Sequence, residues 1–301
     1  MKRESFGSRL GFILVSAGCA IGIGNVWKFP YICGAYGGAA FILIYLCFLV
    51  ILGIPVLVAE FAVGRGSHTS VAKCFDKLAP AGSCWKPLKF IGIIGCYMLM
   101  MFYTTVGGWM IYYCVKSLRG DFVGATPEAV TQSFSDMLGN APTMMLWMVI
   151  ICLIGFAVCF MGLQNGIEKI SKVMMSALLI IMVILAVHSV MMEGAGEGIR
   201  FYLIPDFQKI KEAGVGNVVF AALSQSFFTL SIGIGAMLIF GSYLDKSRSL
   251  TGEAVSITVL DTFVALTAGF IIIPACFSYG IQPDACLLYT SPSPRDISGS
   301  R

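Results

Sequence analysis

The segment from Gly18 to Pro30 constrains this chain more than any other. It lies in an apolar run long enough to cross a bilayer, yet it contains three glycines, an asparagine, a lysine and a proline. Backbone polar groups in hydrocarbon need internal partners, so an opened helix of this kind survives only where it lines a buried cavity. A second glycine-interrupted segment, 227–235, has the same character. Two such segments in corresponding positions of two halves are typical of the binding site of a secondary transporter.

The composition indicates a membrane protein. Hydrophobic residues make up 57% of the chain and charged residues 12%, and the mean hydropathy is +0.86. A soluble domain has roughly twice that charge content. The first apolar stretch is too long for a signal peptide, so we expect an all-α polytopic membrane protein with about 18 to 20 residues or more in each span. Seven such stretches are predicted, at approximately 10–33, 39–64, 88–115, 143–163, 173–192, 215–243 and 254–282.

The distribution of Lys and Arg predicts the orientation. With a cytoplasmic N-terminus, twelve of these residues fall on the cytoplasmic side and five on the opposite side. This bias follows the positive-inside rule and favours that orientation. The net charge of +4 arises from the same asymmetry and does not indicate a nucleic-acid partner. The short loops and the absence of an Asn-X-Ser/Thr site are typical of a bacterial protein, which predicts the bacterial inner membrane.

Neither the cysteines nor the histidines indicate a metal centre or an enzyme. Most of the eleven cysteines lie within predicted spans, and no Cys-X-X-Cys or Cys/His metal spacing occurs. We interpret them as small apolar packing residues. His68 and His188 have no partner at ligand spacing and are interpreted as structural. Because no His, Cys, Ser or carboxylate groups stand at catalytic spacing, the sequence argues against a membrane enzyme.

The composition changes abruptly after the seventh predicted span. Residues 289–301 are rich in Ser, Pro and Arg, and residues 286–296 resemble translated sequencing adapter or vector. Stretches of this kind are either disordered or foreign to the fold. We therefore expect a transmembrane core over 1–282, a non-native or disordered tail over 283–301, and an N-terminal fragment of a longer transporter.

The first broken segment can hold a cation beside an anion. Its glycines let the backbone leave helical geometry and approach a ligand closely. Unpaired N–H groups at the start of its outer half point at anions. The alternative is an ordinary small-residue packing face, Gly18 to Gly22. The oxygen ligands expected for a sodium ion are the carbonyls of Gly18, Ala20 and Ile21 and the side chain of Asn25.

The second broken segment places Thr229 and Ser231 ahead of Gly233 and Gly235. Hydroxyls and opened carbonyls again suit sodium or an amine. The alternative is that both hydroxyls bond the preceding turn of a kinked helix. The pairing of two such segments is more specific than either alone.

Two carboxylates lie within predicted spans. Asp261 is in the seventh, and an intramembrane carboxylate is costly and usually functional. A bound cation would keep it ionised; the alternative is a local hydrogen bond or protonation near the helix entrance. Glu60 could pair with Arg65 or bond the backbone of a broken helix, and we interpret it as structural support.

Other polar groups are less specific. By pattern alone, Tyr103 is one of many packing aromatics. Gln225 and Lys28 are polar residues at depth that suit a water-filled vestibule. Arg3 is equally compatible with a cytoplasmic gate and with a snorkelling anchor.

Taken together, these motifs resemble the neurotransmitter:sodium symporter family, over residues 3 to about 282. The resemblance implies a LeuT-type fold of two inverted five-helix repeats, usually followed by two helices, here truncated after about seven. It also implies sodium-coupled uptake of an amino acid by alternating access, as in bacterial LeuT-like transporters. The motifs are 8–12, 22–31, 37–41, 53–55 with Glu60, 225–231 and 242–244.

Carried over by residue, the resemblance implies two sodium ions and no organic cofactor. The first ion would bind the Ala20 carbonyl, Asn25, Thr229, Asp261 and the substrate carboxylate. The second would bind the Gly18 and Ile21 carbonyls with ligands from an eighth helix. The expected substrate-binding residues are Ala20, Gly22, Gly24, Leu99, Tyr103, Phe228, Thr229, Ser231 and Ile234, with Tyr103 on the carboxylate. Arg3 and Phe6 match a cytoplasmic gate, and Lys28 replaces the usual arginine of the external gate.

Two departures from the family pattern are informative. Gly22 stands where monoamine transporters carry an aspartate, which favours an amino acid over a dopamine-like amine. Ala265 stands where chloride-dependent members place a serine, and Asp261 already supplies a fixed negative charge, so we expect chloride-independent transport. Leu99 and Ile234 favour a neutral side chain on the substrate.

Three alternatives remain open. A sodium-independent exchanger of the same fold would lack the oxygen set of Asn25, Thr229 and Asp261. A truncated fragment would lack helices eight to twelve and would not transport. A truncated regulatory partner would have a structural role. Membrane lipid is an expected partner in each case, and a homodimer is compatible with the resemblance.

Overall fold

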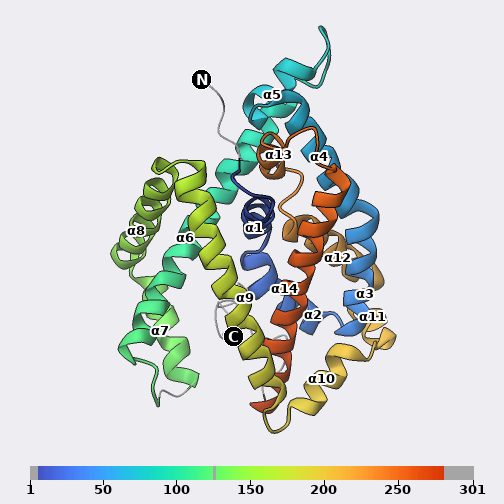
Figure 1. Cartoon of the computed structure of the whole chain (residues 1–301). Helices are drawn as coiled ribbons and strands as arrows, with labels where there is room; N and C mark the ends of the chain where they lie inside the picture. Colours follow the sequence, from blue (N-terminus) through green and yellow to red (C-terminus); the bar gives the residue numbers. More distant parts are fainter. Residues whose placement is uncertain (1–5, 125–126, 281–301) are drawn as a thin grey trace, which may run out of the picture.

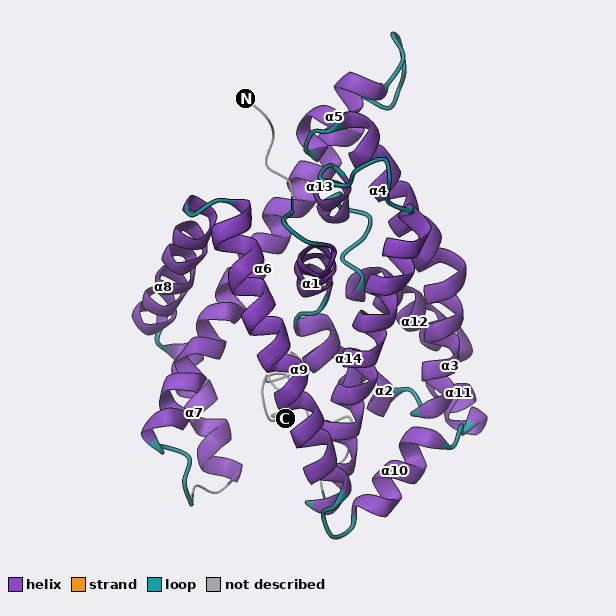
Figure 2. Ribbon diagram, in the orientation of Figure 1, coloured by secondary structure: helices purple, strands orange, loops and turns teal. Residues whose placement is uncertain are grey.

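The computed structural model describes residues 6–124 and 127–280. Within these ranges the chain forms helices joined by loops and contains no strand (Figure 2). Arg3 and the predicted tail over 283–301 lie outside the described residues. The first half contains α1 (Arg9–Ala20), η1 (Gly24–Lys28), α2 (Phe29–Ala35), α3 (Ala39–Phe48), η2 (Leu49–Gly53), α4 (Ile54–Ser67), α5 (Val71–Leu78), α6 (Leu88–Arg119), α7 (Pro127–Gly139) and α8 (Ala141–Phe160). The rest contains η3 (Leu163–Glu168), α9 (Lys169–Val190), α10 (Ala195–Leu203), α11 (Phe207–Ala213), α12 (Val215–Thr229), α13 (Ala236–Gly241) and α14 (Leu250–Ser278).

Six of the seven predicted spans are confirmed, the first of them as a bent pair of helices. Five helical rods are long and apolar enough to cross a membrane, and the first predicted span is a pair, α1 and η1–α2, bent by 55°. The stretch 215–243 is interrupted between α12 and α13. The fifth predicted span begins at Leu163, ten residues before its predicted start, because η3 continues directly into α9. Polar residues in η3 hid its helical character from a hydropathy argument.

The broken helices lie at the centre of the molecule. Figure 1 shows α1 surrounded by longer helices, with α9 and α14 crossing the middle and α6, α7 and α8 grouped on one side. Helix α14 packs against α9, α1, α2, η1 and α4, while α12 packs against α3, η1 and η2. The buried hydrophobic core therefore forms around the two breaks and α14.

Close helix contacts depend on residues without side chains. On α13, a Cβ at Gly241 would lie 2.6 Å from the Phe61 Cα of α4. The backbones of α13 and α4 can approach this closely only because Gly241 has no Cβ, as in many membrane helix pairs.

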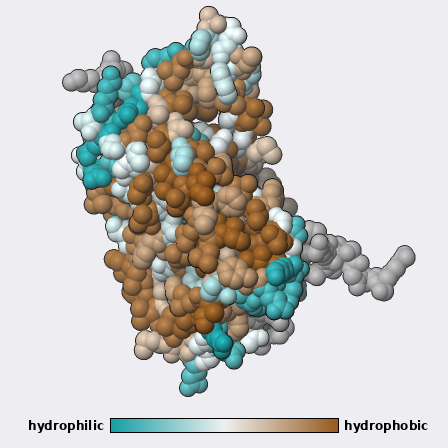
Figure 3. All heavy atoms as spheres, turned by 90° about the vertical axis from the view of Figure 1, so that its right-hand side faces the viewer, coloured by the Kyte–Doolittle hydropathy of each residue, from teal (hydrophilic) through white to brown (hydrophobic). Residues whose placement is uncertain are grey.

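The outer surface is apolar. Helix α8 has no buried residue, and side chains such as Phe156 and Phe160 are exposed on it. Apolar side chains also cover most of the face seen in Figure 3. Exposed apolar surface on this scale marks contact with a partner or a membrane, and its combination with long apolar helices indicates lipid.

Replacing Gly241 by valine should destabilise the protein. The added atoms meet the α4 backbone, and overpacking of this kind typically costs about 1–3 kcal/mol. The matched control is Gly155→Val on α8, where an added Cβ would have nothing within 4 Å. Thermal unfolding in detergent should show a lower melting temperature for Gly241→Val alone; equal shifts for both variants would contradict this interpretation.

Candidate functional site

The two helix breaks meet inside the molecule. Helix α12 ends at Thr229 and α13 begins at Ala236, with Ser231 between them at φ 52°. That left-handed conformation is uncommon for a residue other than glycine. The Ser231 hydroxyl donates to the carbonyl of Cys19 at 3.1 Å, near the end of α1. This hydrogen bond ties one unwound segment to the other, and both predicted breaks are present.

Glu60 of α4 supports the second break. Its Oε1 accepts from the Gly233 N–H at 2.6 Å and its Oε2 from the Leu238 N–H at 3.2 Å. Of the two predicted roles of Glu60, the structure therefore shows the hydrogen bonds to backbone and not the ion pair with Arg65. Arg65 instead donates to the carbonyl of Arg248 at 2.8 Å. A carboxylate in this position satisfies two backbone donors that no helix turn can satisfy.

Gln225 supports the first break in the same way. Its Nε2 donates to the carbonyl of Gly24 at 2.9 Å, and the side chain is fully buried. The prediction of a water-filled vestibule around Gln225 is therefore wrong. The side chain is enclosed because α12 packs directly against η1, where it meets an opened carbonyl.

A buried polar cluster joins both breaks to α14. The Asn25 amide donates to Asp261 Oδ1 at 2.8 Å and to the Asp261 carbonyl at 3.1 Å. The Thr229 hydroxyl donates to Asp261 Oδ2 at 2.9 Å. All three side chains are fully buried. The structure thus brings together three predicted sodium ligands that lie far apart in the sequence.

Tyr45 of α3 is a neighbour of this cluster that was not predicted. It is fully buried, and its hydroxyl lies near Thr229, Thr262 and Asp261. The available signal was a tyrosine in the otherwise apolar run 39–53. A buried hydroxyl in this position adds a further polar group to the cluster.

A cavity of about 240 Å³ opens beside the second break. Five of the nine predicted substrate-binding residues line it and are thus brought together. Three further lining residues were missed, although each lies next to, or within a helical turn of, a predicted one. The lining consists of Leu99, Tyr103, Phe228, Ser231 and Ile234, together with the missed Ser224, Phe227 and Ile232.

The two glycines of the first break face this cavity's aromatic residues. A Cβ on Gly22 would lie 3.6 Å from the Tyr103 Oη, and one on Gly24 would lie 2.8 Å from the Phe228 ring. Tyr103 therefore lies beside the first break as well as lining the cavity. The Lys28 ammonium lies 4.2 Å from the centroid of the Phe228 ring, where a cation–π contact covers that ring.

The remaining predicted ion ligands lie elsewhere. Gly18 and Ile21 line a separate, largely apolar cavity of about 690 Å³ between α1 and α9. Ala20, between them, is buried at the end of α1. The two carbonyl ligands that the resemblance assigns to the second ion thus line a cavity that does not include Asn25, Thr229 or Asp261.

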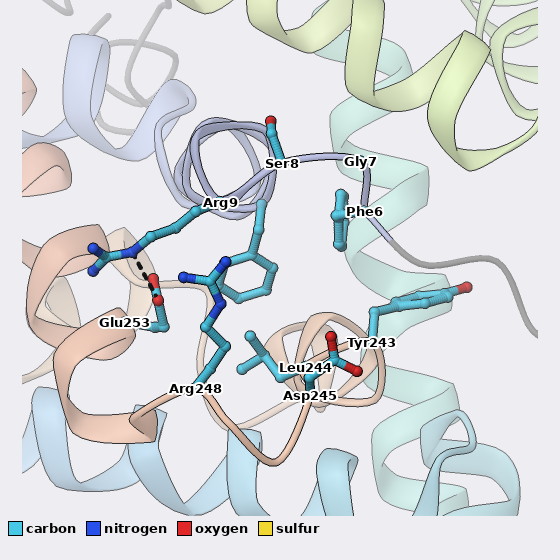
Figure 4. A pocket seen from close by; sticks show the side chains of 10 residues that line it. Phe6, Gly7, Ser8, Arg9, Tyr243, Leu244, Asp245, Arg248 and Glu253 are labelled. Carbon is cyan, nitrogen blue, oxygen red and sulfur yellow. Dashed lines mark hydrogen bonds and ion pairs between the residues drawn. The ribbon is translucent and has the colours of Figure 1, made fainter.

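The start of α1 borders a smaller pocket of about 100 Å³ (Figure 4). Phe6 contacts Phe12 and Tyr243 there, with ring centroids 5.5 and 5.8 Å apart. The Arg9 Nε and the buried Glu253 form an ion pair at 2.9 Å, marked in Figure 4. This pair was not predicted, because Arg9 and Glu253 are 244 positions apart in the chain.

A second buried carboxylate holds the same end of α1. Glu168 accepts from the Gly7 N–H at 2.8 Å, from the Ser8 hydroxyl at 3.3 Å and from the Lys172 ammonium at 2.7 Å. A side chain on Gly11 would overlap the Glu168 carboxylate. Two carboxylates, from η3 and from α14, thus fix the first turn of α1.

Comparison with known proteins gives a consistent result. The model of the sodium:neurotransmitter symporter family matches residues 3–126 and 128–280. The uncharacterized sodium-dependent transporter YhdH of Bacillus subtilis is 36% identical, over 96% of this chain and 63% of its own length. An uncharacterized sodium-dependent transporter of Haemophilus influenzae is 33% identical, over 94% of this chain and 63% of its own length. The crystal structure of MhsT in complex with L-phenylalanine superposes with a TM-score of 0.86 at 37% identity, covering 96% of this chain and 65% of MhsT. The chain thus spans about 63% of the length of these curated relatives.

Replacing Thr229 by valine should destabilise the buried cluster. The change keeps the shape but removes the hydroxyl that donates to Asp261, and a lost hydrogen bond to a charged group costs about 1.5–3 kcal/mol. The control is Thr267→Val on α14, whose hydroxyl donates only to the carbonyl of Phe263 one turn earlier. Melting temperatures in sodium-free buffer should fall clearly more for Thr229→Val, and the assignment fails if the two variants unfold alike.

Proposed function

Because the chain belongs to the sodium:neurotransmitter symporter family, we propose that its unwound segments bind sodium together with a neutral amino acid. Transport would occur by alternating access, and the protein is a transporter rather than an enzyme. Its long apolar helices make it a multi-pass membrane protein. The N-terminus would be cytoplasmic, and the location would be a bacterial inner membrane.

The cluster of Asn25, Thr229 and Asp261 is the observation that carries this proposal. Sodium is a hard cation and takes oxygen ligands. The cluster offers the Asp261 carboxylate and the Thr229 hydroxyl. The Asn25 nitrogen now faces Asp261, and rotation of the amide group would turn its oxygen toward a bound ion. A fully buried carboxylate needs a compensating charge, and a sodium ion carried as substrate would supply it. The Ala20 carbonyl would complete this side of the ion.

A second sodium ion would bind the carbonyls of Gly18 and Ile21. Both residues face the cavity between α1 and α9, apart from the Asp261 cluster. Backbone carbonyls at the end of a broken half-helix are suited to a monovalent cation in a transporter.

The cavity beside Tyr103 suits an amino acid. The Tyr103 hydroxyl and the opened backbone near Gly22 and Gly24 would bind the carboxylate. Apart from the hydroxyls of Ser224 and Ser231, the remaining lining, with Leu99 and Ile234, is apolar and favours a neutral side chain. Pockets combine an apolar lining with a few placed polar groups in this way. The L-phenylalanine bound in the related MhsT structure supports the same substrate class.

Transport should not require chloride. The Asp261 carboxylate already places a negative charge beside the Thr229 and Tyr45 hydroxyls. A mobile anion at that position would be repelled by the fixed one. The sodium-independent exchanger is the less favoured alternative, because it has no use for a buried oxygen cluster around a carboxylate.

The proposal is tested by binding of tritiated L-phenylalanine to the purified protein. We expect binding in sodium chloride and in sodium gluconate but not in potassium salts. In proteoliposomes, an inward sodium gradient should drive uptake of the same ligand. Binding that ignores the replacement of sodium by potassium would refute sodium coupling, and a strict need for chloride would refute chloride independence.

Asp261→Asn should weaken sodium-dependent binding. The change removes the buried charge but keeps a hydrogen-bonding side chain, and loss of a charged ligand worth about 1.5–3 kcal/mol corresponds to roughly 10- to 150-fold in sodium affinity. Asp136→Asn, on the exposed side of α7, is the control of equal charge change. Sodium titrations should separate the two variants; an unchanged sodium affinity in Asp261→Asn would remove this residue from the ion site.

A further inference from the structure

The connection between α4 and α6 concentrates positive charge at one end of the molecule. Figure 1 shows α5 at the end opposite α7 and α10. Residues 65–89 contain five basic residues and a single acidic one, Asp76. The basic residues are Arg65, Lys73, Lys77, Lys86 and Lys89.

Helix α5 has one buried and one charged side. Val71 and Cys74 are buried, and Val71 fills the space left by the missing side chain of Gly92 on α6. Lys73 and Lys77 are exposed on the other side. A short helix of this kind lies on a surface, with its apolar side already covered by the protein.

Much of the positive charge on this connection is not neutralised. Lys89 pairs with Asp76 at 2.8 Å. Lys73 and Lys86 have no carboxylate within 4 Å in the part of the chain that the structure describes. The surface therefore presents ammonium groups that an external anion can bind.

Exposed apolar side chains accompany these lysines. Trp85 is 64% exposed and Leu78 is 45% exposed. Helix α6 begins three residues after Trp85, and Phe90 and Ile91 open its exposed apolar face. The lysines and the tryptophan thus lie where the lipid-facing side of α6 begins, and Trp and Lys are enriched at this level of a membrane protein.

We propose that a basic patch, formed by Lys73, Lys77, Trp85 and Lys86, binds the headgroups of anionic phospholipids. The ammonium groups match the lipid phosphates in charge, and the indole ring lies among the headgroups. The patch is continuous with the lipid-facing side of α6. This favours a lipid, whose acyl chains can contact that side, over an acidic protein, whose charged groups cannot.

The patch is linked to the second break by a packing contact of α5. Val71 of α5 also packs against Gly235, where a Cβ would lie 2.7 Å from the Val71 Cγ2. Gly235 precedes α13 at the end of the second break. A lipid that fixes α5 at the membrane surface would therefore also fix one wall of the unwound segment.

The test measures quenching of Trp85 fluorescence by lipid in nanodiscs. The complete chain and Trp85→Phe are reconstituted in phosphatidylcholine that carries the same small fraction of brominated phosphatidylglycerol or brominated phosphatidylcholine. The difference between the two proteins isolates Trp85. We expect stronger quenching by brominated phosphatidylglycerol, and the excess should decline as salt is raised.

Lysine variants in the same assay separate specific binding from general charge. Lys73→Gln/Lys86→Gln should reduce the preference for the anionic lipid by roughly 5-fold per lysine removed. The control is Lys209→Gln/Lys211→Gln on α11, which removes two exposed lysines elsewhere. The proposal would be overturned by any of three results. These are equal quenching by both lipids, a lipid preference that salt does not change, and equal effects of the two double variants. Phenylalanine binding is measured separately, so failure of the lipid proposal is distinct from failure of the transport proposal.

Discussion

The structure depends on satisfying opened backbone inside an apolar molecule. Each break exposes N–H and C=O groups that lipid cannot satisfy. Glu60 takes up two donors of the second break, and Gln225 supplies a donor to the first. Ser231 then links the two segments through the Cys19 carbonyl. Three side chains on α4, α12 and the second break therefore hold the centre of the protein in its non-helical geometry.

The same constraint creates the site. Because the breaks leave room at Gly22 and Gly24, Tyr103 and Phe228 can approach the first unwound segment. Because α14 packs against η1, Asp261 reaches a position between both breaks. The groups that stabilise the fold and the groups suited to a substrate and an ion are thus neighbours. A substitution at one should affect the other, which is a general property of strained functional sites.

The ends of the broken helices are held differently from the centre. Ion pairs and hydrogen bonds to Glu168 and Glu253 fix the start of α1. At the second break, α5 packs on Gly235 through Val71. The first contacts are electrostatic and depend on two carboxylates, whereas the second is apolar and depends on the position of α5.

Features with a local cause were determined by the sequence itself. Span lengths follow from hydropathy, both breaks follow from glycine and polar residues at depth, and Asp261 stands out as an intramembrane carboxylate. The resemblance to a family then grouped Leu99 and Tyr103 with the breaks, which no periodicity in this chain could have done.

Pairings between distant residues were decided only by the tertiary structure. Asn25 and Asp261 are 236 positions apart, and Glu60 lies 173 positions from Gly233. Arg65 is a potential partner of Glu60 close in sequence, but in the folded protein Glu60 accepts from the backbone N–H groups of Gly233 and Leu238. Hydropathy indicates which polar groups are buried, and a buried polar group needs a hydrogen-bond partner. Which partner it finds depends on how whole helices pack, and that is settled by the summed contacts of the complete core rather than by any one residue.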